Sequence, residues 1–290
     1  MRTRPLGKTG LDVSELCMGC WEIGGLFWGP MDVKDAQRLL NAAHDAGVNT
    51  YDLADVYGNG RSECLIGRTL GDRRDELVLV TKAGYLPGAD SVQFLYEKQV
   101  QCHDPRYVQW CCEMSLRRLE TDYVDVFLLH DPPVETMRRE SVWNALRKLK
   151  EQGKARFIGV SASPEVIPLA IEMGAEVVEF PFNLLTREPV TEILPLAKKQ
   201  GVGVLARSPF ASGGLHRKGQ DAPAKAFRFL AKKGRPLTEA AIKYALAHDG
   251  VAAVVAGLMK RSDLNKNVAA CKRPLLNKTE LKRIAAIVTP

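Results

Sequence analysis

The sequence lacks any long run of apolar residues. A helix that crosses a membrane needs about 20 mostly apolar residues in succession, and no stretch of the 290 residues approaches that length. Residues 1–5 lead into polar residues without the apolar core of a secretory signal. We therefore expect no membrane partner and a cytoplasmic location.

Residues that could ligate a metal are also scarce. The chain has five histidines, and only His130 directly follows a predicted strand, whereas a metal-dependent hydrolase on a barrel needs several histidine and carboxylate ligands together. Cys17-Met-Gly-Cys20 has the spacing of a zinc or redox pair, but no second pair accompanies it. We expect no metal, and we interpret this pair as packing in a buried strand.

The seven cysteines do not indicate disulfides. An odd number leaves at least one unpaired, and a chain of this length can bury a large core without covalent cross-links. Reduced thiols in a reducing compartment are the better interpretation.

The formal net charge is +7, but no run of lysine and arginine carries interleaved aromatic residues. Such a run is typical of nucleic-acid-binding surfaces, and the basic residues here are scattered over predicted helix faces. An anionic small ligand explains a modest positive balance equally well. We expect no nucleic-acid partner.

The chain does contain a repeated unit, in which a short apolar strand precedes an amphipathic helix. The predicted strands are residues 16–20, 50–51, 77–81, 124–129, 157–160, 175–179, 202–206 and 251–256. The predicted helices are residues 33–46, 63–70, 105–119, 138–152, 165–173, 190–200, 237–247 and 262–270. The units predict an α/β fold, a (β/α)8 TIM barrel in one domain spanning residues 1–290.

Further segments add to this barrel. Residues 2–6 and 11–14 predict an amino-terminal β-hairpin, and the residues after Thr279 predict a carboxy-terminal extra helix. Long connections follow the third and seventh strands, at residues 82–103 and 208–236, and such loops commonly handle ligands. Helix ends are predicted from C-cap glycines and N-cap serines at Gly47, Gly153, Gly174, Gly201, Ser163 and Ser262.

Ionisable residues follow three neighbouring strands. Asp52, Lys82 and His130 stand at the carboxyl ends of the second, third and fourth strands, where a barrel places its active site. Tyr57 comes five residues after Asp52. We therefore expect these four side chains to converge.

This set suits the reduction of a carbonyl group, which needs hydride at carbon and a proton at oxygen. We expect the Lys82 ammonium to lower the pKa of Tyr57, the proton donor, and Asp52 to keep the lysine charged and oriented. A neutral His130 would donate a hydrogen bond to the carbonyl oxygen.

The same segments resemble the aldo-keto reductase superfamily. Asp52-x4-Tyr57-Gly58, Thr81-Lys82 and Leu128-Leu-His130-Asp-Pro132 are similar to the family tetrad in type, order and spacing. Further family-like segments are Gly47-Val-Asn-Thr-Tyr-Asp52, Gly159-Val-Ser161, Phe182-Asn-Leu-Leu185 and Gly257-x9-Asn267. The resemblance implies a metal-independent NAD(P)H-dependent oxidoreductase that converts aldehydes or ketones reversibly to alcohols and binds its cofactor without a Rossmann domain, in agreement with the lack of a G-x-G-x-x-G motif.

The resemblance also implies cofactor and substrate contacts. The cofactor residues are Gly19, Cys20, Trp21, Asp52, Ser161, Ala162, Glu179, Arg207, Ser208, Pro209, Phe210, Ser212, Gly257, Leu258, Met259, Lys260, Arg261, Asp263 and Asn267. The substrate residues, around a small carbonyl compound, are Trp21, Trp28, Tyr57, Tyr85 and His130; Trp28 could equally be packing.

Four of these positions depart from the family pattern. Ala162 replaces the usual Asn, unless Ser163 substitutes, and Glu179 replaces the usual Gln. Arg207 replaces the aromatic residue that stacks on nicotinamide, and we expect its flat guanidinium to stack there while paired with Glu179. Lys260 and Arg261 favour NADPH over NADH, although Asp263 stands where a basic or neutral residue is usual.

These departures leave an alternative open. A regulatory protein that binds a nicotinamide cofactor with little turnover, like channel-associated relatives, would keep the fold and most contacts. The four predicted catalytic residues argue against it.

Overall fold

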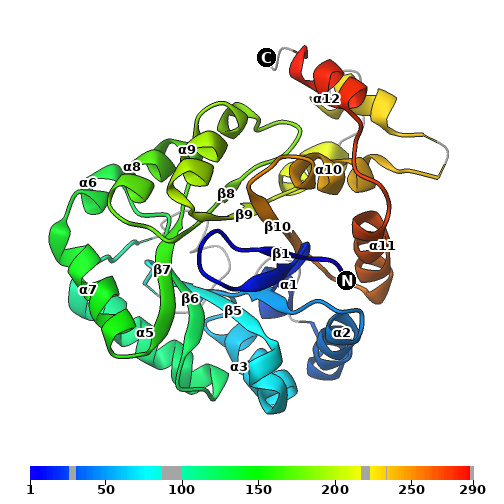
Figure 1. Ribbon diagram of the computed structural model, residues 1–290. Coiled ribbons are helices and arrows are strands. Elements are labelled where there is room, and N and C mark those ends of the chain that lie inside the picture. The colour runs from blue at the N-terminus through cyan, green and yellow to red at the C-terminus, as the bar shows by residue number, and fades with distance from the viewer. Residues whose placement is uncertain (26–30, 87–99, 217–222, 233, 288–290) are drawn as a thin grey trace.

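Eight parallel strands form a closed barrel in the described part of the chain, with helices around its outside (Figure 1). The computed structural model describes residues 1–25, 31–86, 100–216, 223–232 and 234–287. The barrel strands are β3 (Leu16–Gly19), β4 (Thr50–Asp52), β5 (Val78–Ala83), β6 (Val124–His130), β7 (Ala155–Ser161), β8 (Val177–Pro181), β9 (Gly203–Arg207) and β10 (Val251–Gly257). Strand β10 pairs with both β9 and β3, which closes the ring. The predicted TIM barrel is confirmed.

The helices follow the strands in sequence. They are α1 (Trp21–Gly24), α2 (Val33–Asp45), α3 (Arg61–Leu70), α5 (Pro105–Leu119), α6 (Val134–Met137), α7 (Glu140–Glu151), α8 (Ile167–Glu172), α9 (Ile193–Gln200), α10 (Leu237–Leu246), α11 (Arg261–Lys272) and α12 (Lys278–Ala285). The 3-10 turns are η1 (Gly71–Glu76), η2 (Pro164–Val166), η3 (Glu188–Val190), η4 (Ala211–His216) and η5 (Pro223–Leu230). Helix α12 is the predicted extra helix. No helix in these ranges is long and apolar enough to cross a membrane.

Side chains of the barrel strands pack into two apolar layers, one against the helices and one inside the ring. In β6, Phe127 and Leu129 pack outward against the helices, whereas Val126 and Leu128 point into the barrel. Both faces of the strands are therefore covered, which explains their nearly continuous apolar sequence.

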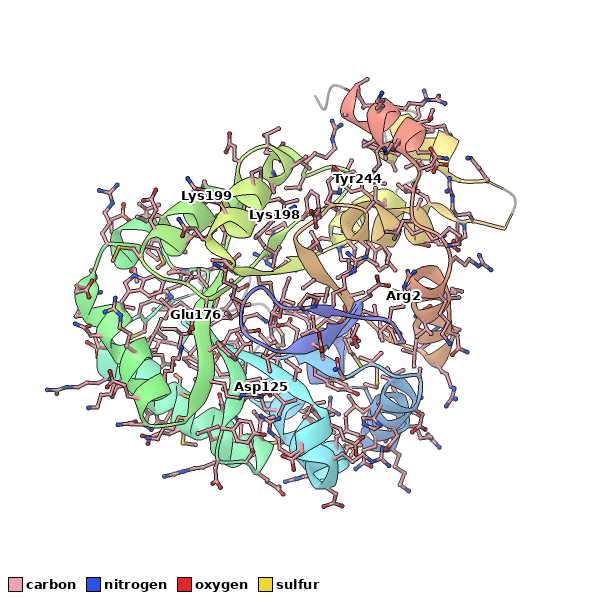
Figure 2. All side chains as sticks on the ribbon, viewed as in Figure 1. Arg2, Asp125, Glu176, Lys198, Lys199 and Tyr244 are labelled. Carbon is pink, nitrogen blue, oxygen red and sulfur yellow. The ribbon has the colours of Figure 1, made fainter. Side chains whose placement is uncertain are left out.

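A hairpin of β1 (Thr3–Pro5) and β2 (Asp12–Ser14) closes the amino-terminal end of the barrel. It lies across the opening that faces the viewer in Figure 1, and Leu6 joins the interior cluster. Gly203, at the start of β9, makes room for Leu6, because a Cβ there would lie 2.6 Å from Leu6 Cγ. Asp125 and Glu176, labelled in Figure 2, lie at this same end. The carboxyl ends of the strands are thus left for the site.

Several predicted helix boundaries are wrong. Helix α7 begins at Glu140 because Arg139 is extended, with φ −84° and ψ 103°, after the separate short helix α6. Ser262 lies inside α11, whose N-cap is Lys260. Gly201 is the left-handed C-cap of α9 as predicted, with φ 76°.

Candidate active site

Strands β4, β5 and β6 bring three of the predicted catalytic residues to the carboxyl end of the barrel. Asp52 and His130 are the last residues of β4 and β6, and Lys82 stands one residue before the end of β5. The strands are adjacent and parallel, so these side chains lie close together.

Lys82 is the centre of the cluster and is completely buried. Its Nζ donates hydrogen bonds to the Asp52 carboxylate, to the Leu53 carbonyl oxygen at 2.9 Å and to the Tyr57 hydroxyl at 3.2 Å. The Tyr57 ring lies 6.0 Å from that of His130, edge to face. The structure therefore brings the four predicted side chains together.

The loop after β4 holds Tyr57 in place through close contact with the loop after β3. Gly58 has φ 65°, and a Cβ there would lie 2.2 Å from the Gly24 carbonyl oxygen. Trp21 packs edge to face on the Tyr57 ring, with centroids 4.9 Å apart. Glycine at both contact points lets the two loops approach and fixes the phenol above Lys82.

The pKa of Tyr57 is raised, contrary to the expectation from the sequence. Burial is the main cause; Lys82 lowers the pKa as expected, but Asp52 and Glu179 raise it again. The phenol therefore holds its proton firmly at neutral pH.

The lysine remains charged because two carboxylates face it. Burial acts to lower the pKa of Lys82, but Asp52 and Glu179 together raise it well above the ordinary value. The pKa of Asp52 is also raised, by burial and by Glu179. Burial, followed by the charges of Lys82 and Arg207, lowers the pKa of His130, which keeps its imidazole neutral.

The predicted ion pair between Glu179 and Arg207 is wrong. Glu179 is buried inside the barrel, where its Oε1 accepts a hydrogen bond from the Ser161 hydroxyl at 2.8 Å and lies 3.6 Å from Lys82 Nζ. Arg207 is partly exposed and pairs through Nη2 with Asp131 Oδ1 at 3.2 Å. The two side chains therefore have different charged partners.

Asp131 is a site residue that sequence reasoning missed. Its Oδ2 accepts a hydrogen bond from the Tyr85 hydroxyl at 3.0 Å, and Tyr85 packs edge to face on His130 with centroids 4.9 Å apart. Asp131 has a left-handed backbone, with φ 44°. Its position directly after His130 was the available signal. The predicted substrate residue Trp28 lies outside the described residues.

The positions next to Ser161 are less polar than the resemblance implies. Ala162 is buried. Ser163, considered as a substitute for the missing amide, is the N-cap of η2, and its hydroxyl bonds the Glu165 side chain, lowering the pKa of that carboxyl.

The ends of β3 and β10 form a second part of the site. Gly19 pairs with Gly257, and a Cβ on Gly257 would lie 1.8 Å from Glu22 Oε1. Burial raises the pKa of Glu22, another residue that sequence reasoning missed although it follows Trp21. Cys17 and Cys20 are buried in β3 and directly after it, free of disulfides.

The loop after β10 leads into α11 with basic residues. Lys260 is the N-cap of α11 and Arg261 its first residue, and both are exposed. Asp263 pairs with Lys266 at 3.8 Å, and Asn267 is buried. Leu258 is buried and Met259 exposed.

The connection after β9 borders the same end of the barrel. Ser208 and Ser212 have left-handed backbones, with φ 56° and 49°, and Asn183 Nδ2 donates to the Ser208 carbonyl oxygen at 3.0 Å. Phe210 packs against the main apolar cluster of the barrel. Pro209 lies between Ser208 and Phe210 in the sequence.

Comparison with known proteins agrees with this geometry. The model of the aldo/keto reductase family matches residues 15–289. The uncharacterized oxidoreductase YqkF of Bacillus subtilis is 30% identical, over 98% of this chain and 95% of that protein. A probable voltage-gated potassium channel subunit beta of Oryza sativa subsp. japonica is 32% identical, over 99% and 97%. The holo form of aldo-keto reductase AKR11C1 from Bacillus halodurans superposes with a TM-score of 0.87 at 31% identity, covering 98% of this chain and 95% of that one. The chain belongs to the aldo/keto reductase family, whose members are oxidoreductases that use nicotinamide cofactors.

Proposed function

We propose that this protein reduces aldehydes or ketones of small molecules reversibly to alcohols, with Tyr57 as the proton donor. The observation that carries the proposal is the hydrogen bond of 3.2 Å from the buried Lys82 ammonium to the Tyr57 hydroxyl, beside Asp52. A nicotinamide nucleotide would supply the hydride when bound.

The described residues fit such a cofactor. The buried polar atoms without a hydrogen-bond partner in the described residues include three around the catalytic cluster: His130 Nδ1, Glu179 Oε2 and Arg207 Nε. Glu179 Oε2 suits an amide N–H, and the flat Arg207 guanidinium suits stacking on an aromatic ring. Ser161, Ser208, Ser212 and the segment from Gly257 to Asn267 would hold the remainder.

The exposed cations at the start of α11 support NADPH rather than NADH. Lys260 and Arg261 combine two positive charges with the N-terminus of a helix, which is a favourable place for a phosphate. Asp263 is partly neutralised by Lys266.

Each catalytic side chain then has a separate task. Tyr57 keeps its proton until the substrate oxygen gains negative charge, because its pKa is raised, and Lys82 stabilises the phenolate that remains. Asp52 holds Lys82 in position. Neutral His130 orients the substrate oxygen by a hydrogen bond, and Trp21 and Tyr85 supply aromatic walls for the substrate.

The decisive experiment follows the absorbance of NADPH and of NADH with a panel of small aldehydes, ketones and quinones. We expect the wild type to oxidise NADPH and the Tyr57→Phe variant to lose this activity while still binding the cofactor. Equal turnover in both proteins would exclude Tyr57 as the donor.

A regulatory protein that binds the cofactor with little turnover is the second candidate. The resemblance to a probable channel subunit over 99% of the chain favours it, as does the missing amide at Ala162. Tight NADPH binding without turnover on any carbonyl compound would select this candidate.

A further inference from the structure

Two buried carboxylates share one buried cation in this site. Asp52 and Glu179 both lie within 4.0 Å of Lys82 Nζ. Among the described residues, neither carboxylate has another cationic side chain within that distance. The side chains of all three are at most 5% exposed, so water screens their charges poorly.

The neighbouring groups do not compensate the second carboxylate. Arg207 is paired with Asp131. His130 is kept neutral, and burial raises the pKa values of the Cys17 and Cys20 thiols, which keeps them neutral too. Glu179 Oε2 is buried without a partner in the described structure. The interior of the site therefore has an excess of one negative charge when both carboxyls are ionised.

The proposed reaction produces a positive charge close to this excess. A nicotinamide bound here would be neutral before it supplied the hydride and positively charged afterwards, while Tyr57 would give its proton to the substrate oxygen and remain as the phenolate beside Lys82. The reacting atoms must lie about 3 to 3.5 Å apart, and Lys82 Nζ contacts both the Tyr57 hydroxyl, at 3.2 Å, and Glu179 Oε1, at 3.6 Å. The cation thus forms within reach of the Glu179 charge.

We propose that Glu179 makes this site bind the oxidised, positively charged nicotinamide in preference to the reduced, neutral form. This inference rests on the proposed function and adds a property of the same site: when both nucleotides are present at equal concentration, the oxidised one occupies the site. Glu179 acts here through its charge, not as a proton donor.

The test compares the dissociation constants of NADP⁺ and NADPH without substrate, by titration calorimetry, in the wild type and three variants. The two nucleotides differ only at the nicotinamide ring, so their ratio isolates the effect of ring charge. In Glu179→Gln we expect the preference for NADP⁺ to fall about tenfold, as for unit charges about 12 Å apart at an effective dielectric constant near 20.

Two further variants show whether the effect comes from the charge at residue 179, from the shape of its side chain, or from the loss of any carboxylate in the protein. Glu179→Asp keeps the charge and should keep most of the preference. Glu176→Gln makes the same chemical change just before β8, at the opposite end of the barrel, and should leave the ratio unchanged. Thermal melting checks that each variant is folded.

An unchanged ratio in folded Glu179→Gln, with both nucleotides still bound, overturns this inference and leaves the proposed function intact. A loss of preference in Glu179→Asp as large as in Glu179→Gln also overturns it, since shape would then be the cause. If neither nucleotide binds the wild type, the proposed function fails, and the inference fails with it.

Discussion

Arg207, at the end of β9, pairs with Asp131, which directly follows β6, through a contact of 3.2 Å between Nη2 and Oδ1. The pair crosses the carboxyl ends of β7 and β8, which lie between β6 and β9. The Arg207 guanidinium lies near His130 and helps to lower the pKa of that imidazole. Asp131 also accepts the Tyr85 hydroxyl, so one carboxylate orients a cation and an aromatic wall of the site.

Replacing Asp131 should therefore affect ligand binding more than stability. We expect Asp131→Asn to cost about 0.5 kcal/mol of unfolding free energy or less, because the ion pair is partly exposed. The dissociation constant for NADPH should rise severalfold, because Arg207 loses its fixed position. Urea unfolding and cofactor titration measure the two effects. Asp249→Asn, which breaks an exposed pair with Lys198, is the control, and an equal change in cofactor affinity there would contradict the assignment.

Replacing the buried cation Lys82 should lower the stability of the folded protein strongly. Lys82→Met leaves the carboxylates of Asp52 and Glu179 buried without a counterion, and we expect a loss of about 3–5 kcal/mol of unfolding free energy at neutral pH. The loss should shrink at acidic pH, where protonation neutralises the carboxyls. Urea unfolding at two pH values measures this, and the double variant Lys82→Met/Asp52→Asn should recover part of the stability. A larger loss at acidic pH would contradict this electrostatic account.

His130 should make the protein less stable in acid. Its pKa is lowered in the folded state, so its contribution is complete above the ordinary pKa near 6.5 and is lost as the pH falls below that value, by up to about 1.4 kcal/mol per pH unit. His130→Gln should reduce the difference in unfolding free energy between pH 7 and pH 5. Two other histidines with lowered pKa values, His103 and His248, remain in both proteins, so the difference between them isolates His130. An identical pH dependence would show that the pKa of His130 is the same in the folded and unfolded states, which would contradict this prediction.

Gly257 should be sensitive to a single methyl group. A Cβ there would meet the Glu22 carboxyl at 1.8 Å, and we expect Gly257→Ala to cost about 1–3 kcal/mol through overpacking. Adding Glu22→Ala should restore most of this stability, because the obstructing group is a side chain rather than backbone. A double-mutant cycle by thermal unfolding measures the coupling. Additive effects would mean that the backbone of β10, and not Glu22, limits the space.

The start of α11 should determine the choice between cofactors. Replacing Lys260 and Arg261 with alanine should weaken NADPH about tenfold or more, the size expected for lost charge-assisted hydrogen bonds. NADH lacks the additional phosphate and should bind unchanged. Fluorescence titration of both nucleotides tests this, with Lys266→Ala on the same helix as the control. An equal loss for NADH would place these cations elsewhere on the cofactor.

The barrel and the catalytic cluster could be predicted because both depend on local rules. Apolar strands covered on two faces are visible in sequence, and polar residues at the carboxyl ends of such strands, such as Asp52 and His130, lie at the end where a barrel places its active site. The ion pair between Arg207 and Asp131 could not be predicted from the sequence, because its two residues lie at the end of β9 and directly after β6, which are separated by two strands of the barrel. The direction of the Tyr57 pKa depends on burial, which outweighs the nearby charge of Lys82. Ser262 was a misleading cap signal, since α11 begins before it.

The hairpin that closes the amino-terminal end has a consequence for biosynthesis. Leu6 packs against Gly203 in β9, and the Arg4 guanidinium donates to the carbonyl oxygens of Leu246, the last residue of α10, and Val251, the first residue of β10. The hairpin can form its own strand pairing and its ion pairs with Glu15 early, but these contacts with β9, α10 and β10 must wait until residue 251 has been translated. We expect the nascent chain to keep its early strands in an open sheet and to form the ring in a late, slow step.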